Sequence, residues 1–391
     1  MERFRRLTAL AAAFVLLFIC ALPAAAQKGS GEGIRNVIFM IGDGMGFNHL
    51  RLAEQEGYEL FMQENADLAG ESRTRSTIEV TDSAAGATAL SAGVRTANAC
   101  VGVYPSDVLG LFTAPRLITE AARGLGMRVG VVTTDLTSGA TPAGFTAHTL
   151  NRNQPGEITR DQLKTGFDLI WGANEAAADP ADIAAAGYTR VSSREDLASL
   201  APGDKSFGQF SLNTWKLETD ADDPSPTLKE MTEEALRLLS SDAGHGFFLM
   251  VEGAHIDKWS HLKPGGVADS PYKRQNAAEA VKAFDRAVEA AVDFARRDGH
   301  TLVIVTADHE TGNLYAENGE YVFHSWSHTG VNVPVFVYGS DTFIENGQAV
   351  DNYELPVRVA KALGWDEAVF PAVEPGDLTD KLAEALLRLA G

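Results

Sequence analysis

Cysteine is almost absent from the sequence, which has two such residues among 391. One of them, Cys20, lies in an apolar N-terminal segment that we expect to be removed, so that Cys100 alone remains. A chain with one cysteine forms no internal disulfide bond. If the protein works in an oxidising compartment, its stability must therefore come from its core and from bound metal.

Basic residues are also scarce, with 33 Lys and Arg against 53 Asp and Glu and a formal net charge of −20. A surface of this sign repels the phosphate backbone, so nucleic-acid binding is excluded as a function class. Internal repeats are absent as well. Hydrophobic residues make up 45% of the chain, which is enough for a sizeable core and excludes a disordered protein.

The N-terminus has the pattern of a secretory signal peptide. Three arginines precede the apolar run 7–22, and small residues follow Pro23 up to Ala26. An uncleaved membrane anchor is the alternative, which Pro23 and the Ala-x-Ala site disfavour. The residues before Cys20 are too large for a lipid-attachment site. We expect cleavage near Ala26, no stable membrane anchor afterwards, and a secreted or periplasmic protein.

Five apolar runs alternate with helical stretches through the rest of the chain. Each run is continuous, as in strands that are buried on both faces. The runs are Asn36 to Ile41, Val129 to Thr134, Phe247 to Val251, Leu302 to Thr306 and Val333 to Val337, and the helical stretches include Ala114 to Leu125, Thr227 to Leu239 and Tyr272 to Arg297. This alternation predicts a three-layer α/β sandwich, in which helices flank a central, mostly parallel sheet.

Polar residues follow several of these predicted strands. Asp43, Glu252, Asp308 and His309 all stand at carboxyl ends, where parallel sheets bind ligands. We therefore expect them to lie close together. Residues 27–391 are interpreted as a single domain, and the Ala-, Asp- and Pro-rich stretch at about 161–223 as a peripheral excursion from it.

The segment 80–93 is the most informative part of the chain. The small residues from Ser83 onwards predict a helix that Asp82 or Ser83 caps and Gly93 ends. Amide groups and the dipole at a helix N-terminus attract anions, so a phosphate would be held against the Ser83 hydroxyl. Taken alone, such a serine is more often only a cap, and the residues around it decide between the two interpretations.

Three further segments carry residue types that bind metal ions. Asp257 and His261 are four residues apart and share one face of a helix, although such pairs are also common on ordinary helix surfaces. Asp308 and His309 follow a buried strand, where they bind metal or cap a turn. His328 precedes the last strand, and its alternative interpretation is an ordinary loop histidine.

The number of these ligands exceeds the needs of one metal ion. A buried carboxylate such as Glu252 is costly unless it meets a cation. The mixture of oxygen and nitrogen ligands suits two zinc ions and one oxygen-bound magnesium ion. Metal ions beside a helix-capping serine favour displacement at phosphorus.

At this point the sequence resembles the alkaline phosphatase family. The resemblance extends from about Asn36 to Gly339, and its motifs occur in the family's order. They are Ile41-Gly42-Asp43-Gly44-Met45-Gly46, Thr81-Asp82-Ser83-Ala84-Ala85, Ala140-Thr141-Pro142-Ala143, Val251-Glu252-Gly253-Ala254-His255-Ile256-Asp257, Thr306-Ala307-Asp308-His309 and His328-Thr329-Gly330. An alkaline-phosphatase-like fold is implied.

The resemblance also implies roles for the matching residues. Ser83 corresponds to the nucleophile that becomes phosphorylated. The zinc that activates the attacking water would be held by Asp257, His261 and His328. A second zinc next to the serine oxygen would be held by Asp43, Asp308 and His309. The magnesium site would be lined by Asp43, Thr141 and Glu252.

Arg152 stands where the family has its phosphate-clamping arginine, whose guanidinium group can bind two phosphate oxygens. At Gly139 many relatives carry Asp or His, which helps to organise magnesium and its waters, so this chain has no side chain for that task. Lys258 matches the lysine of one branch and either contacts phosphate through water or is only a solvated neighbour. The family usually dimerises, but the short segment between Gly312 and His324 makes a homodimer less secure.

Together these observations indicate a zinc- and magnesium-dependent phosphomonoesterase of broad specificity, acting on small-molecule phosphate monoesters at alkaline pH. Two alternatives stay open. A phosphodiesterase or sulfatase of the same superfamily is disfavoured by Arg152, which needs two free phosphate oxygens, and by the lack of a Cys-x-Pro-x-Arg motif. A non-catalytic secreted protein that binds metal or phosphate is disfavoured because only Gly139 departs from the positions needed for turnover.

Overall fold

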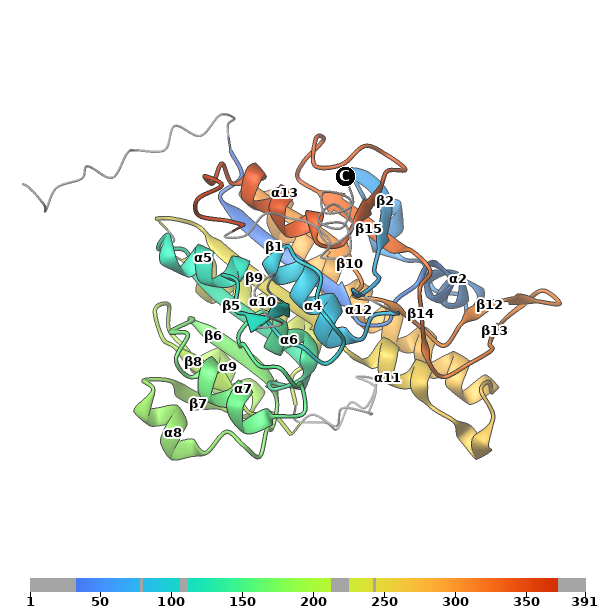
Figure 1. Ribbon diagram of the computed structural model, residues 1–391, viewed down its shortest axis with the longest axis horizontal. Coiled ribbons are helices and arrows are strands. Elements are labelled where there is room, and N and C mark those ends of the chain that lie inside the picture. Colours follow the sequence, from blue (N-terminus) through green and yellow to red (C-terminus); the bar gives the residue numbers. More distant parts are fainter. Residues whose placement is uncertain (1–32, 78–79, 106–111, 212–224, 242–243, 372–391) are drawn as a thin grey trace, which may run out of the picture. The chain divides into compact units, whose positions relative to one another are not determined.

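A computed structural model describes residues 33–77, 80–105, 112–211, 225–241 and 244–371 (Figure 1). The described residues from Ile34 onwards belong to one compact unit, and the description below concerns that unit. The predicted signal peptide, residues 1–26, lies outside the described residues. Within the described ranges, none of the helices combines the length and the apolar character needed to cross a membrane.

The strands form one large sheet and three small ones. They are β1 (Asn36–Gly42), β2 (Leu68–Arg73), β3 (Tyr104–Pro105), β4 (Phe112–Thr113), β5 (Arg128–Leu136), β6 (Leu169–Ala173), β7 (Thr189–Val191), β8 (Ser206–Gly208), β9 (Phe247–Gly253), β10 (Thr301–Thr306), β11 (Glu310–Thr311), β12 (Leu314–Glu317), β13 (Glu320–Phe323), β14 (His328–Thr329), β15 (Val333–Tyr338) and β16 (Ala349–Asp351). The large sheet has the order β16-β2-β15-β10-β1-β9-β5-β6-β8-β7. Its strands from β10 to β7 are parallel, whereas β15 pairs antiparallel with both β10 and β2.

Helices cover both faces of this sheet. They are α2 (Phe47–Gln55), α3 (Phe61–Glu64), α4 (Ser83–Ala92), α5 (Ile118–Gly124), α6 (Ala140–Gly144), α7 (Pro155–Gln162), α8 (Pro180–Ala185), α9 (Arg194–Ser199), α10 (Leu228–Ser240), α11 (His255–His261), η1 (Pro264–Gly266), α12 (Pro271–Asp298) and α13 (Glu354–Ala362). Apolar residues of α4, α5 and α13 belong to the core on one face, and those of α2, α10 and α12 to the core on the other (Figure 1).

The central strand β1 shows why the sheet needs two helical layers. All seven of its residues are buried. Ile38 and Met40 belong to the core under α10 and α12, whereas Val37, Phe39 and Ile41 belong to the core under α4 and α5. Because successive side chains point to opposite faces, a continuous apolar run requires cover on both sides. The three-layer α/β fold expected from the apolar runs is confirmed.

The described part of the stretch at about 161–223 joins the central sheet. Strands β6, β8 and β7 continue the sheet beyond β5, and all of their pairings are parallel. Helices α8 and α9 lie between these strands in sequence. This region therefore forms one end of the sheet, built from strands of three to five residues.

The register of the sheet brings polar residues to one edge. Ile41 of β1 pairs with Thr306 of β10 on one side and with Glu252 of β9 on the other. Glu252 also pairs with Thr133 of β5. Asp43 and Asp308 follow this level by two residues, so β10, β1 and β9 deliver carboxylates to the same edge, and β5 adds the hydroxyl of Thr133.

Candidate active site

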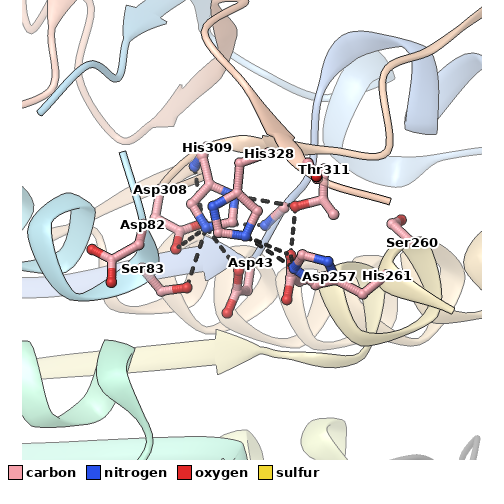
Figure 2. A network of polar contacts seen from close by, with 12 residues as sticks. Asp43, Asp82, Ser83, Asp257, Ser260, His261, Asp308, His309, Thr311 and His328 are labelled. Atoms are coloured by element: carbon pink, nitrogen blue, oxygen red, sulfur yellow. Dashed lines mark hydrogen bonds and ion pairs between the residues drawn. The ribbon is translucent and has the colours of Figure 1, made fainter. Parts of the chain in front are cut away.

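Ser83 is the first residue of α4 and is buried beside that edge. Asp82 is the N-cap, and its Oδ1 accepts a hydrogen bond of 3.0 Å from the backbone N–H of Ala85. The Ser83 hydroxyl is therefore not the cap of this helix. Its Oγ points toward His309 and lies 3.2 Å from the Nε2 of that ring (Figure 2). The helix ends at Gly93, which adopts a left-handed φ of 71°.

Asp43, Asp308 and His309 form a first group of potential metal ligands, called here the Asp43 cluster. Their ligand atoms lie within 4.8 Å of one another, and all three residues are buried. His309 Nε2 lies 3.2 Å from Asp308 Oδ2 and 3.7 Å from Asp43 Oδ1. Because the same nitrogen faces Ser83, the cluster is in direct contact with the serine hydroxyl.

Asp257, His261 and His328 form a second group, called the Asp257 cluster. Their ligand atoms also lie within 4.8 Å of one another. Asp257 Oδ1 lies 3.2 Å from Nε2 of His261 and 3.7 Å from Nε2 of His328. The two Nε2 atoms are 3.0 Å apart, so three ligand atoms converge on one point (Figure 2).

The orientation of both histidines in the Asp257 cluster is fixed from behind. Nδ1 of His261 is 2.5 Å from the carbonyl oxygen of Trp326, and Nδ1 of His328 is 2.9 Å from that of Thr81. A carbonyl oxygen only accepts, so each Nδ1 carries the proton and donates it. When the ring is neutral, each Nε2 then has a free lone pair, which is the form in which histidine binds a metal ion.

Thr311 and a ring stack join the two clusters. The Thr311 hydroxyl donates to Asp257 Oδ1 and lies 3.2 Å from Nδ1 of His309. The rings of His309 and His328 stack with their centroids 3.6 Å apart. The clusters are therefore neighbouring parts of one site (Figure 2).

A third polar group surrounds Glu252, which is 1% exposed. The Thr133 hydroxyl donates a hydrogen bond to Glu252 Oε2. Burial, followed by the charge of Asp135, raises the pKa of Glu252 to about 8, although the hydroxyls of Thr133 and Thr141 act in the opposite direction. Oxygen atoms dominate this group, as magnesium prefers.

The pKa values of two buried carboxylates of the site, Asp43 and Asp308, are raised. Burial and the neighbouring charge of Asp308 raise the pKa of Asp43 well above its ordinary value. Burial and Asp257 raise the pKa of Asp308 to about 6. Among the described residues, Asp43 Oδ1 and Asp308 Oδ2 are buried oxygens without a hydrogen-bond partner. Such oxygens are stabilised when they coordinate cations, so the residues fit bound metal.

A histidine in the first cluster and a carboxylate in the second have lowered pKa values. Burial and the neighbouring His328 lower the pKa of His309, which keeps its ring neutral. Burial opposes ionisation of Asp257, but the hydrogen bond and charge of His261 outweigh it and hold the pKa of Asp257 well below its ordinary value. A neutral imidazole and an ionised carboxylate are the forms that bind metal ions.

Two cationic side chains lie at the rim of this site. Arg152 Nη1 donates a 3.1 Å hydrogen bond to Oδ2 of Asp82, so the helix cap also orients the guanidinium group. Lys258 Nζ donates a 2.8 Å hydrogen bond to Oδ1 of Asp135. The side chain of Lys258 is 19% exposed.

The sequence-derived candidates come together in three sets. Ser83 contacts the Asp43 cluster, the second cluster contains all three residues expected to act together, and the Thr141 hydroxyl lies close enough to Glu252 to lower its pKa. Sequence reasoning missed Thr311 and the link from Asp82 to Arg152. Thr311 lies two residues after His309, just beyond the motif 306–309, which was the available signal for it.

Comparison with known sequences gives a consistent result. The profile of the family described as alkaline phosphatase matches residues 34–170 and 174–327. Alkaline phosphatase 3 of Bacillus subtilis (strain 168) is 31% identical over 325 residues, which cover 77% of this chain and 66% of that protein. Streptomycin-6-phosphate phosphatase of Streptomyces griseus is 32% identical over 374 residues, with coverages of 78% and 80%. The chain thus spans slightly less than two thirds of the Bacillus protein and four fifths of the Streptomyces protein.

Solved structures show the same similarity. The alkaline phosphatase of the Antarctic bacterium TAB5 is 29% identical, with a TM-score of 0.70 over 85% of this chain and 99% of that one. A variant of that enzyme with magnesium bound in its M3 site has a TM-score of 0.71, at the same identity and coverage. Alkaline phosphatase of Thermus thermophilus shares the fold at 21% identity, with a TM-score of 0.73 over 88% of this chain and 96% of that one.

Proposed function

Because the chain belongs to the alkaline phosphatase family, we propose that it hydrolyses small-molecule phosphate monoesters through a phosphoserine formed at Ser83. One observation carries the proposal. The Ser83 hydroxyl lies at the N-terminus of α4 and 3.2 Å from His309 Nε2, at the junction of an anion-binding helix end and a buried ligand cluster. A phosphoryl group placed there is within reach of both.

The metal requirement follows from the donor sets. Asp43, Asp308 and His309 would hold one zinc ion, and Asp257, His261 and His328 a second. Asp43, Thr141 and Glu252 would hold magnesium. When bound, such ions supply Lewis-acid stabilisation of negative charge on phosphoryl, serine and leaving-group oxygens.

The protein's own groups bind and orient the ester. The positive end of α4 favours the dianionic phosphate beside Ser83. Arg152 is held by Asp82 through one nitrogen of its guanidinium group, and the rigid fork of that group would bind the phosphate. Two free phosphate oxygens match this fork, and a diester offers fewer charged oxygens to it.

The chemistry then takes two displacements. In the first, Ser83 Oγ gives its proton to solvent water and bonds to phosphorus while the ester P–O bond breaks, and the leaving alkoxide takes a proton from solvent water. In the second, water bonds to phosphorus, the P–Oγ bond breaks, and inorganic phosphate is released as Ser83 regains a proton. Each displacement converts one covalent bond at phosphorus into another, so no oxidant or further co-reactant is needed.

Turnover of an aryl phosphate and of the corresponding bis-aryl diester by the purified protein tests the proposal. We expect the monoester to be cleaved faster, and Ser83→Ala to abolish turnover. Ser91→Ala is the matched control, because Ser91 is another buried serine of α4 and its hydroxyl donates to the carbonyl oxygen of Gly144. Faster cleavage of the diester would favour a phosphodiesterase. Phosphate or metal binding without any turnover would favour a non-catalytic protein.

Metal identity is measured in the same experiment. Elemental analysis should find zinc and magnesium near two and one per chain, and chelation should remove both the metals and the activity. Turnover that persists in metal-free protein would contradict the assignment of the two clusters.

The proposal also covers the location of the protein and its oligomeric state. The N-terminal pattern supports cleavage near Ala26 and a secreted or periplasmic location. Mass spectrometry of the mature protein should find an N-terminus close to Gln27. Residues 312–324 contain only the hairpin β12–β13 between their ends, and sedimentation would distinguish a monomer from a homodimer.

A further inference from the structure

Gly139 has no side chain, and the space that one would take is occupied by Asp135. Gly139 is the N-cap residue of α6, two residues before Thr141. A Cβ atom built at Gly139 would lie 2.8 Å from Oδ2 of Asp135 and 3.0 Å from the carbonyl oxygen of Leu136. The first distance is shorter than van der Waals contact, so the carboxylate of Asp135 occupies the space that a side chain at position 139 would need.

Asp135 is connected to the Glu252 group through its backbone and its charge. Its N–H donates a 2.8 Å hydrogen bond to Thr133 Oγ1, and the same hydroxyl donates to Glu252. After burial, the charge of Asp135 is the largest influence that raises the pKa of Glu252. Asp135 therefore lies near the oxygens that would hold magnesium.

Lys258 is the cation that faces these carboxylates. Its Nζ bonds to Asp135 Oδ1 at 2.8 Å, and both side chains are about four fifths buried. Burial disfavours its charge, but attraction to Asp135, and then to Glu252 and Asp43, raises its pKa. The ammonium group of Lys258 is thus attracted to three carboxylates, and it forms its hydrogen bond with that of Asp135.

The carboxylate with which Lys258 pairs affects the binding of a divalent cation. An ammonium group paired with Glu252 or Asp43 would neutralise the oxygens that magnesium needs and would repel the ion. While Lys258 is bound to Asp135, those oxygens stay available. Loss of the Asp135 charge would release Lys258 toward them.

Resting on the proposed function, we propose that Asp135 is a positioning residue of the magnesium site, which holds Lys258 away from Glu252 and Asp43 in place of a side chain at Gly139. Glycine at position 139 preserves this arrangement, because a Cβ there would push the Asp135 carboxylate aside. Asp135 acts through Lys258, so its contribution disappears when the lysine charge is removed.

Calorimetric titration of MgCl2 into the zinc-loaded protein measures this directly and needs no turnover. Asp135→Asn should weaken magnesium binding about tenfold, the lower end of the effect of removing an outer-shell partner. Lys258→Gln should bind magnesium at least as tightly as the wild type. The double variant should regain the affinity of Lys258→Gln.

Gly139→Ala supplies a second, independent variant. Its backbone φ of −53° suits alanine, so the chain should fold, and the displaced Asp135 should again lower magnesium affinity only when Lys258 is present. Gly156→Ala and Asp182→Asn are the matched controls. Gly156 has no neighbour within 4 Å of a built Cβ, and Asp182 is exposed on α8.

Wild-type affinity in Asp135→Asn would overturn the inference and leave the proposed phosphatase activity untouched. An equal loss in the single and double variants would also overturn it, because Asp135 would then act without Lys258. If the wild type binds no magnesium, both this inference and the proposed magnesium site are wrong, while the serine and zinc chemistry remains testable by the aryl phosphate assay.

Discussion

A buried lysine makes a quantitative prediction about stability in alkaline solution. Lys273 of α12 is 0% exposed. Its Nζ donates hydrogen bonds to the carbonyl oxygens of Ala268 at 2.8 Å and Ser325 at 3.4 Å, and lies 4.1 Å from the ring centroid of Phe323. Burial lowers the pKa of Lys273 to about 8, although Asp269 and Glu310 act in the opposite direction.

The sign of the effect follows from proton counting. In the unfolded chain the lysine keeps its proton up to its ordinary pKa of 10.5, whereas in the folded protein it loses it near pH 8. Between these values the unfolded state binds more protons, so the free energy of unfolding rises with pH. The gap between the two pKa values sets an upper limit of roughly 3 kcal/mol for this rise.

Urea unfolding at constant ionic strength and saturating zinc, from pH 7 to 10.5, measures the effect. The free energy of unfolding of Lys273→Met, which keeps a flexible apolar chain, should lack this rise, so its difference from the wild type should change by up to about 3 kcal/mol. Lys361→Met, at an exposed position of α13, is the control and should run parallel to the wild type. Parallel curves for Lys273→Met and the wild type would refute the reasoning, because metal-site titrations are common to both proteins.

Three further predictions concern the site. A Cβ on Gly86 of α4 would lie 3.0 Å from Cβ of Asp308, so Gly86→Ala should shift Ser83 and lower kcat about tenfold or more. Because alanine favours helices, the melting temperature of this variant should change little. An unchanged kcat would contradict the packing argument. Arg152→Lys keeps the charge but loses the fork, and should raise KM for an aryl phosphate about tenfold, whereas equal KM values would remove the proposed clamp. Removal of metal by chelation should lower the free energy of unfolding, measured by calorimetry, by about 4 kcal/mol relative to the protein with zinc at 1,000 times its dissociation constant, and added zinc should restore it. An identical melting temperature with and without zinc would contradict metal binding at the buried carboxylates.

Much of the fold was predictable because burial on both faces is visible in the sequence. The five continuous apolar runs became β1, β5, β9, β10 and β15. Strand β2 was missed because its residues alternate between buried and exposed and include Gly70 and two charged residues. The antiparallel direction of β15 was also not predictable, since it is set by the path of the chain after β10 and not by the residues of the strand.

The site was predictable only where residue type and resemblance agreed. Spacing alone allowed Asp257 and His261 to be an ordinary surface pair, and it is His328, from a distant strand, that completes their cluster. Asp135 directly follows the predicted strand 129–134, but its role was not predictable, because that role depends on the missing side chain of Gly139 and on the reach of Lys258 across the sheet edge. Such contacts arise from strand register, which a single sequence does not specify.

The position of β1 at the middle of the sheet has a consequence for biosynthesis. This strand leaves the ribosome first among those described, yet the strands on either side of it begin at Phe247 and Thr301. Native pairing must therefore wait for most of translation, since contacts of such long sequence separation form late. The two ligand clusters are completed only at His309 and His328, so a chain that ends before residue 309 contains neither of them.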